Sequence, residues 1–122
     1  MQFTVEFYET LDGKTPVEDF LMSLDIKMRT KVIHLMELLE EKGTSMREPY
    51  TKPLEDGIFE LRCKLGTDLT RALFFFYHGG KIIITNGFVK KTQKTPKEEI
   101  RLAIARREDY ILRNNKTDEN EA

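Results

Sequence analysis

The chain has 122 residues, of which 39% are hydrophobic and 34% are charged, so it can bury one modest core in a single domain. No apolar run reaches the roughly 20 residues that cross a bilayer, and the first residues lack the basic and apolar regions of a signal peptide. The single cysteine, Cys63, excludes an intramolecular disulfide. We therefore expect a cytoplasmic protein.

The net charge of −1 conceals an uneven distribution of charge along the chain. Residues 1–60 carry thirteen acids and seven bases, residues 61–107 carry eleven bases and three acids, and residues 108–122 carry five acids and two bases. A run of like charge is most often only a solvated surface. Here the basic segment coincides with a predicted sheet, which favours a nucleic-acid or acidic-protein partner.

A strand and a short helix are predicted at the start of the chain. Residues 3–8 alternate between apolar and polar positions, as a strand does. A helix start follows, because Thr15 can cap with its hydroxyl, Pro16 suits the first helical position and Glu18 can complete a capping box. This helix ends near Leu24.

A second helix follows, with Asp25 as its expected cap and Gly43 as the residue after its end. Its apolar positions share one helical face. They are Met28, Val32, Leu35, Met36 and Leu39. Residues 44–57, which contain two prolines, are predicted to form a loop, and the two helices should form an antiparallel hairpin.

Three strands of an antiparallel meander come next. Residues 58–65 alternate, so that Cys63 faces the core and Glu60, Arg62 and Lys64 share the other face. Residues 69–78 are apolar enough for a central strand. Gly79-Gly80 predicts a two-residue hairpin loop before the third strand, residues 81–88.

A last helix is predicted after Thr95-Pro96-Lys97-Glu98, which repeats the capping-box pattern. Its apolar face carries Ile100, Ala103, Ile104 and Ile111. We expect one domain over residues 1–113 and a polar, disordered tail over 114–122. The fold class is α+β, with a small twisted antiparallel sheet packed against helices.

Hairpin geometry gathers basic residues at one end of this sheet. A two-residue loop at Gly79-Gly80 places Arg71 opposite Phe88, and the preceding turn places Arg62 beside Arg71. Lys90 and Lys91 follow just beyond Phe88. Cations this close either bind an anion or pair with carboxylates, and Glu60 and Asp68 are near enough to neutralise an arginine. The pattern leaves both possibilities open.

Other reactive groups are isolated in the sequence. His34 is expected on a helix surface and His78 in a turn, too far apart for a metal site, and no cofactor is expected. The chain contains no phosphate-binding glycine loop, nucleophile elbow or zinc-ligand spacing. A metal-independent ribonuclease stays possible, because it needs only cations for the phosphate and groups that move protons.

Several segments match motifs of one known group of proteins. They are Glu48-Pro49-Tyr50, Lys52-Pro53-Leu54, Ile58-Phe59-Glu60-Leu61-Arg62, Arg71 with its aromatic strand, and Gly87-Phe88 through Lys90-Lys91-Thr92-Gln93-Lys94-Thr95-Pro96, continued by Glu99-Ile100, Ala103, Arg106 and Asp109-Tyr110. On these segments the chain resembles the HigB-like, phage-derived branch of the RelE/ParE toxin superfamily, and thus a RelE-like fold is expected. The block from Gly87 to Ile100 is the most specific.

The resemblance implies the toxin of a type II toxin–antitoxin module that enters the ribosomal A site and cleaves mRNA without metal. It implies that Arg62 and Arg71 bind the phosphate and the transition state. Lys90 or Lys91 would stabilise charge or protonate the leaving 5′-oxygen. Phe88 would stack on a base. Lys94, Lys52 and Tyr50 are the further substrate-binding candidates, although Tyr50 and Lys52 can equally anchor their loop.

The general base is unassigned, because some relatives use a histidine or a C-terminal tyrosine as acid or base, and no histidine of this chain lies near the predicted site. Glu60, Tyr50 and Lys52 are candidates. The alternatives are a ParE-like gyrase inhibitor without catalytic activity and an inactive interaction protein. The implied partner is a HigA-like antitoxin with a helix-turn-helix domain. It would either cover the basic residues or block ribosome entry sterically.

Overall fold

A computed structural model describes residues 2–90 and 94–121, with side chains up to Asn115. Three helices pack on a five-stranded mixed sheet with strand order β1-β5-β4-β3-β2. The strands are β1 (Thr4–Phe7), β2 (Thr51–Pro53), β3 (Phe59–Leu65), β4 (Asp68–Tyr77) and β5 (Lys81–Lys90). The helices are α1 (Pro16–Ser23), α2 (Ile26–Lys42) and α3 (Lys97–Glu121), with a 3₁₀ turn at Gly43–Ser45. The α+β class is confirmed.

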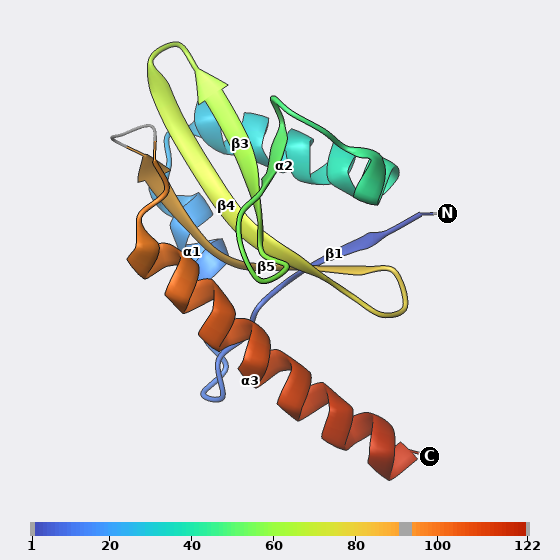
Figure 1. The fold of residues 1–122 in the computed structure, drawn as a ribbon. Helices are drawn as coiled ribbons and strands as arrows, with labels where there is room; N and C mark the ends of the chain where they lie inside the picture. The colour runs from blue at the N-terminus through green and yellow to red at the C-terminus, as the bar shows by residue number, and fades with distance from the viewer. Residues whose placement is uncertain (1, 91–93, 122) are drawn as a thin grey trace.

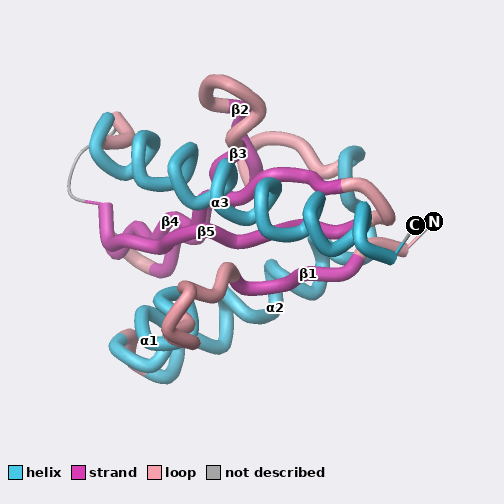
Figure 2. Tube along the Cα trace, turned by 90° about the horizontal axis from the view of Figure 1, so that it is seen from below, coloured by secondary structure: helices cyan, strands magenta, loops and turns pink. Residues whose placement is uncertain are grey.

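The helices form layers on both faces of the sheet. Figures 1 and 2 show α1 and α2 against one face and α3 across the other. The first face carries the larger core, in which Leu61, Cys63 and Phe74 pack against the helical hairpin. The second face carries a smaller core, in which Leu73 and Phe75 pack against α3. Cys63 therefore faces the core, as its strand position predicts.

The sheet differs from the expected antiparallel one at both edges. At one edge, β1 pairs with β5 in parallel, whereas the other neighbouring strands pair antiparallel. β2 lies within the segment predicted as a loop and pairs with β3 from Thr51↔Leu61 to Pro53↔Phe59. Three residues are too few to produce a readable alternation, which is why the sequence gives no sign of this strand.

The expected caps are only partly present. Asp25 caps α2, because its carboxylate accepts a hydrogen bond from the Met28 amide at 3.0 Å, and Pro16 occupies the first turn of α1. The Thr15 side chain makes no capping bond. Gly43 ends α2 with φ +52°, and a Cβ there would lie 2.0 Å from the Phe3 ring, so only glycine fits.

The last helix is longer than predicted. The sequence indicates a disordered tail from Asn114, but α3 continues to Glu121. Contacts to the body occur where this part of the helix begins, since the Tyr77 hydroxyl donates to the Asn115 side chain at 3.0 Å and the preceding Arg113 guanidinium donates to the Glu9 carbonyl at 2.6 Å. These side chains are polar and give no apolar periodicity by which the helix could be recognised.

Candidate functional site

The strand register brings the expected basic residues together. Arg62 lies opposite Arg71 across β3 and β4, and Arg71 lies opposite Phe88 across β4 and β5. Lys90 pairs with Leu69, two residues further along the same strands. All these residues have the strand parity of Leu73 and Phe75, so they lie on the face that α3 covers further along the sheet.

The register is reached differently from the way the sequence predicts. The loop after β4 has three residues, because Tyr77 pairs with Lys81 rather than with Ile82. A bulge at Thr85 then adds one residue to β5, between the pairs Phe74↔Ile84 and Leu73↔Asn86. The two one-residue differences cancel beyond the bulge, and Arg71 therefore still faces Phe88.

A buried carboxylate stands at the centre of the basic residues. Glu60 on β3 is 0% exposed. Its Oε1 lies 3.3 Å from Arg71 Nε, 3.6 Å from Arg62 Nε and 3.9 Å from Lys90 Nζ. Three cations thus face one carboxylate, which partly neutralises them and leaves an excess of positive charge. Pairing with a carboxylate, one of the two possibilities that the sequence left open, is therefore observed.

A threonine connects this carboxylate to the start of α3. The Thr95 hydroxyl donates a hydrogen bond to Glu60 Oε2. The sequence predicts Thr95 as a helix cap, and this is wrong for its side chain, because the buried carboxylate competes for the hydroxyl. The first turn of α3 is closed by the Pro96 carbonyl, which accepts from the Glu99 amide at 3.1 Å. We call Glu60, Arg62, Arg71, Lys90 and Thr95 the Glu60 cluster.

Burial changes the electrostatics of two of these cations. Arg71 and Lys90 are 4% and 6% exposed. Burial lowers the pKa of Lys90, against the attraction of Glu60, and the neighbouring arginines lower it further. Burial likewise lowers the pKa of Arg71, which nevertheless stays charged. Arg62 keeps 23% of its side chain exposed and is the most accessible of the three.

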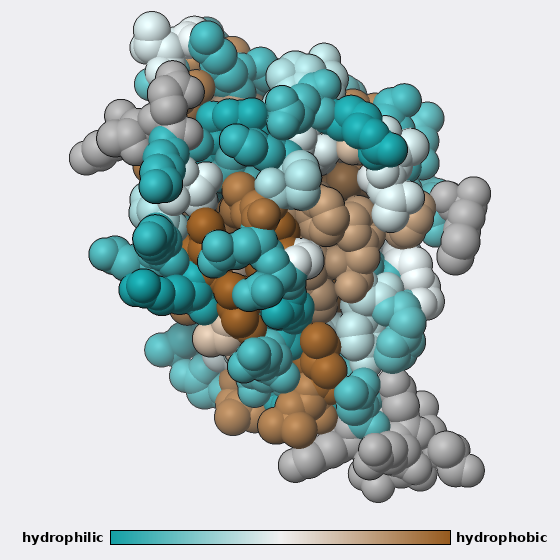
Figure 3. Space-filling view, viewed as in Figure 1, coloured by the Kyte–Doolittle hydropathy of each residue, from teal (hydrophilic) through white to brown (hydrophobic). Residues whose placement is uncertain are grey.

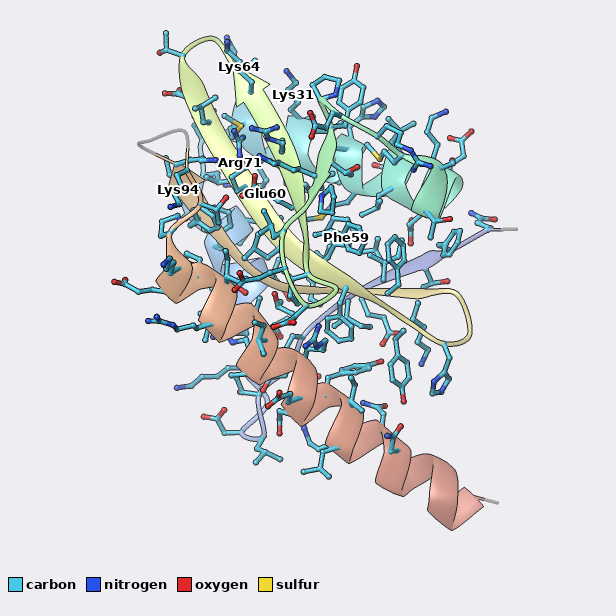
Figure 4. The ribbon with its side chains drawn as sticks, viewed as in Figure 1. Lys31, Phe59, Glu60, Lys64, Arg71 and Lys94 are labelled. Carbon is cyan, nitrogen blue, oxygen red and sulfur yellow. The ribbon has the colours of Figure 1, made fainter. Side chains whose placement is uncertain are left out.

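The other sequence candidates lie around this cluster. Phe88 is half-buried and packs against the core under α3, so only part of its ring can meet a base. Tyr50 is 48% exposed. Lys52, exposed on β2, is close enough to Lys90 to lower the pKa of Lys90. Lys94 is exposed on the segment before α3 (Figure 4). Lys91 lies outside the described residues.

A pocket opens beside the Glu60 cluster, and it includes two lysines that the sequence did not single out as site residues. Arg62, Arg71 and Tyr50 line this pocket of about 620 Å³ together with Lys31 of α2 and Lys64 of β3. The Lys31 ammonium donates to the Lys64 carbonyl. Lys64 could have been found, because it shares the strand face of Arg62. Nothing in the sequence indicates that α2 brings Lys31 here. In Figure 3 this upper end of the molecule is mostly hydrophilic.

The histidines and the cysteine lie away from the cluster. His34 and His78 are exposed, on α2 and in the β4–β5 loop. Burial raises the pKa of the Cys63 thiol, which keeps it protonated and unreactive. No group of three metal-binding side chains occurs among residues 2–90 and 94–115. Within the described part of the chain, no helix is long and apolar enough to cross a membrane.

Comparison with known proteins places the chain in a family. No curated protein matches its sequence. Residues 19–108 match the family described as "Phage derived protein Gp49-like (DUF891)". The matched segment begins in α1 and ends in α3, so it contains β3, β4, β5 and the whole Glu60 cluster. The chain therefore belongs to the Gp49-like family of phage-derived proteins, a relative of the RelE/ParE-like toxin class.

Proposed function

We propose that this protein is the toxin of a type II toxin–antitoxin module and that it cleaves mRNA on the ribosome without metal, in the cytoplasm. One observation carries the proposal. Three cations surround a single buried carboxylate at the end of the sheet that α3 leaves uncovered. Excess positive charge in a partly dry site is suited to a phosphate that gains charge in the transition state.

The proposed reaction is an internal transesterification of RNA. A base removes the proton of a 2′-hydroxyl, the 2′-oxygen forms a bond to the adjacent phosphorus, and the bond from phosphorus to the 5′-oxygen breaks. An acid gives a proton to the leaving 5′-oxygen, and the products are a 2′,3′-cyclic phosphate and a 5′-hydroxyl. Arg62 and Arg71 would neutralise the charge on the phosphoryl oxygens.

The burial of each group limits its role in this reaction. Glu60 is fully buried and ion-paired, so we assign it to positioning the arginines and not to removing the 2′-proton. Lys90 has a lowered pKa, and with Lys91 it is our candidate for the acid. Tyr50 and Lys52 are the exposed candidates for the base.

The proposed partner is a HigA-like antitoxin with a helix-turn-helix domain. If this antitoxin inhibits by covering the Glu60 cluster, it must bring acidic side chains to Arg62 and Lys52, and the complex should weaken as salt is added. If the antitoxin binds the acidic first half of the chain, it must instead block entry of the toxin into the ribosome sterically. A complex insensitive to salt would favour the second mode.

Primer extension on a reporter mRNA in a reconstituted translation system tests the proposed function. Arg62→Ala should lower the cleavage rate by about 10²–10³-fold if Arg62 acts on the transition state. Arg113→Ala is a matched control, because Arg113 is also paired with a carboxylate and is similarly exposed, at 32% against 23%, but lies in the second half of α3, away from the Glu60 cluster. Arg113→Ala should cleave like the parent.

The outcomes separate the proposal from its alternatives. Fragments that need the ribosome and disappear with Arg62→Ala support the endonuclease. Intact mRNA in the presence of the parent protein contradicts it. A gyrase supercoiling assay on the same protein then tests the ParE-like alternative, in which DNA damage responses precede any loss of translation.

A further inference from the structure

The pocket beside the Glu60 cluster extends away from α3, toward α2. Its walls come from the first half of α2, the loop before β2 and the β3–β4 hairpin. Arg62 and Arg71 line the pocket and also pair with Glu60, so the pocket and the Glu60 cluster share these two side chains. A ligand bound to the arginines can therefore continue into the pocket.

The charge of the pocket is entirely positive among its lining residues. Of the described residues that line it, four are cations and none is an acid. They are Lys31, Arg62, Lys64 and Arg71. The carboxylate that pairs with the arginines, Glu60, is buried behind them. Lys31 uses one of its three N–H donors on the Lys64 carbonyl and keeps two for a ligand. These cations suit an anionic group with several oxygens.

Apolar and aromatic side chains also line the pocket. Leu35 and Leu69 line it, together with the half-exposed ring of Tyr50. A nucleobase presents two flat apolar faces, whereas an acidic side chain offers charge without such a surface. A volume of about 620 Å³ is in the range of small-ligand sites. Cations and an aromatic wall together favour a nucleotide over an acidic peptide.

We infer that this pocket is a subsite for one nucleotide of single-stranded RNA, next to the phosphate that Arg62 and Arg71 hold. Lys31 and Lys64 contact the neighbouring phosphate, and Tyr50 stacks on the nucleobase, which leaves Lys52 as the exposed candidate for the general base. Figure 4 shows Lys31 and Lys64 beyond Arg71 toward the hairpin, on the side away from α3. The inference rests on the proposed function, because that function is the reason for taking RNA as the ligand. It adds that the bound RNA continues from the Glu60 cluster toward α2.

Binding of an uncleavable RNA tests the subsite without relying on catalysis. The probe is a fluorescent single-stranded hexanucleotide with 2′-O-methyl groups, followed by anisotropy at several salt concentrations. Lys31→Ala/Lys64→Ala should weaken binding and reduce the slope of log K against log salt by about 1.4, since each lost contact to a single strand removes about 0.7. Tyr50→Leu should weaken binding and leave the slope unchanged.

The matched control removes the same charge from α2 outside the pocket. Lys27→Ala/Lys42→Ala changes two exposed lysines of this helix that do not line the pocket, and it should keep the parent slope. The inference is overturned if the two double variants lose RNA affinity and salt slope equally. It is also overturned if the parent protein does not bind the probe. Hexaglutamate serves as an acidic-peptide competitor. If it displaces the probe as well as unlabelled RNA does, and if Tyr50→Leu does not change its affinity, the pocket is assigned to an acidic peptide instead.

The two proposals fail separately. RNA bound in the pocket by a protein that leaves mRNA intact on the ribosome contradicts the proposed endonuclease and keeps the subsite. Ribosome-dependent cleavage that Lys31→Ala/Lys64→Ala and the control variant retain equally contradicts the subsite and keeps the endonuclease.

Discussion

Two charged clusters tie α3 to the sheet, and they are built in opposite ways. At the middle of α3, Asp109 Oδ2 accepts hydrogen bonds from the Tyr8 hydroxyl at 2.6 Å and from Arg113 at 2.7 Å. One carboxylate meets one cation there, and both side chains are about a third exposed. At the start of α3, Glu60 meets three cations and is fully buried.

The Asp109 cluster has the properties of a structural clamp. The hydrogen bond from Tyr8 lowers the pKa of Asp109, with Arg113 acting in the same direction, so the carboxylate is charged at neutral pH. Its charges balance locally and its position near solvent keeps the desolvation cost small. It joins the end of β1 to α3 and needs no further partner.

The Glu60 cluster is costly as a clamp, because four charged groups lose water there and their charges do not balance. A contact that only held α3 in place could use the arrangement found at Asp109, which has the smaller desolvation cost. In the proposed function, the excess positive charge of the Glu60 cluster binds a phosphate, whereas the Asp109 cluster binds no ligand. The predictions below compare equivalent changes in the two clusters.

The largest difference is expected when each carboxylate loses its charge. Glu60→Gln should lower the free energy of unfolding by about 3–5 kcal/mol, because it leaves buried cations without their counter-charge. Asp109→Asn should lower it by at most about 1 kcal/mol, since that pair is partly exposed. Urea denaturation at pH 7 measures both. Equal losses would mean that Glu60 is no more important to the cations around it than Asp109 is to Arg113.

The sequence predicts the positions of Arg62 and Arg71 well, because both belong to strands whose alternation and connecting turn are local signals. The pairing Arg71↔Phe88 was predicted correctly for a partly wrong reason, since the longer loop and the bulge at Thr85 compensate. No local pattern reveals such a bulge, because Thr85 is buried and bonds to the Leu73 carbonyl through its side chain.

The sequence could not assign Thr95 or Lys31, because both depend on contacts between distant segments. Thr95 followed by Pro96 is a good capping pattern locally, and only the arrival of Glu60 from 35 positions away directs the hydroxyl elsewhere. Lys31 reaches the site because the helical hairpin packs beside β3. Tertiary packing decides both, and a single sequence contains no direct record of it.

The next difference concerns the hydroxyl that each carboxylate accepts. Thr95→Val should destabilise the protein by about 1–3 kcal/mol, because Glu60 Oε2 is left buried without a donor. Tyr8→Phe should cost about 1 kcal/mol, since Asp109 keeps Arg113. Thr95→Ser is the control and should restore most of the stability in urea denaturation. A Thr95→Ser protein as unstable as Thr95→Val would show that the methyl group, not the hydroxyl, is what matters.

The smallest effect is a dependence on pH that only the Glu60 cluster should show. Burial lowers the pKa of Lys90 in the folded protein, while in the unfolded chain the lysine titrates near about 10.4. Between those two values the unfolded chain binds more protons than the folded one, so the stability that Lys90 contributes increases with pH in that window. The advantage of the parent over Lys90→Met should therefore grow as the pH rises above neutral, by up to about 1.4 kcal/mol for each unit of pKa shift.

The difference between the parent and Arg113→Met should stay constant over the same range, because an arginine does not titrate there. Urea denaturation at intervals from pH 7 to about pH 10 measures both differences. An advantage that shrinks with pH would mean that the attraction of Glu60 outweighs the burial of Lys90; the ammonium would then hold its proton too firmly to serve as the acid of the proposed cleavage.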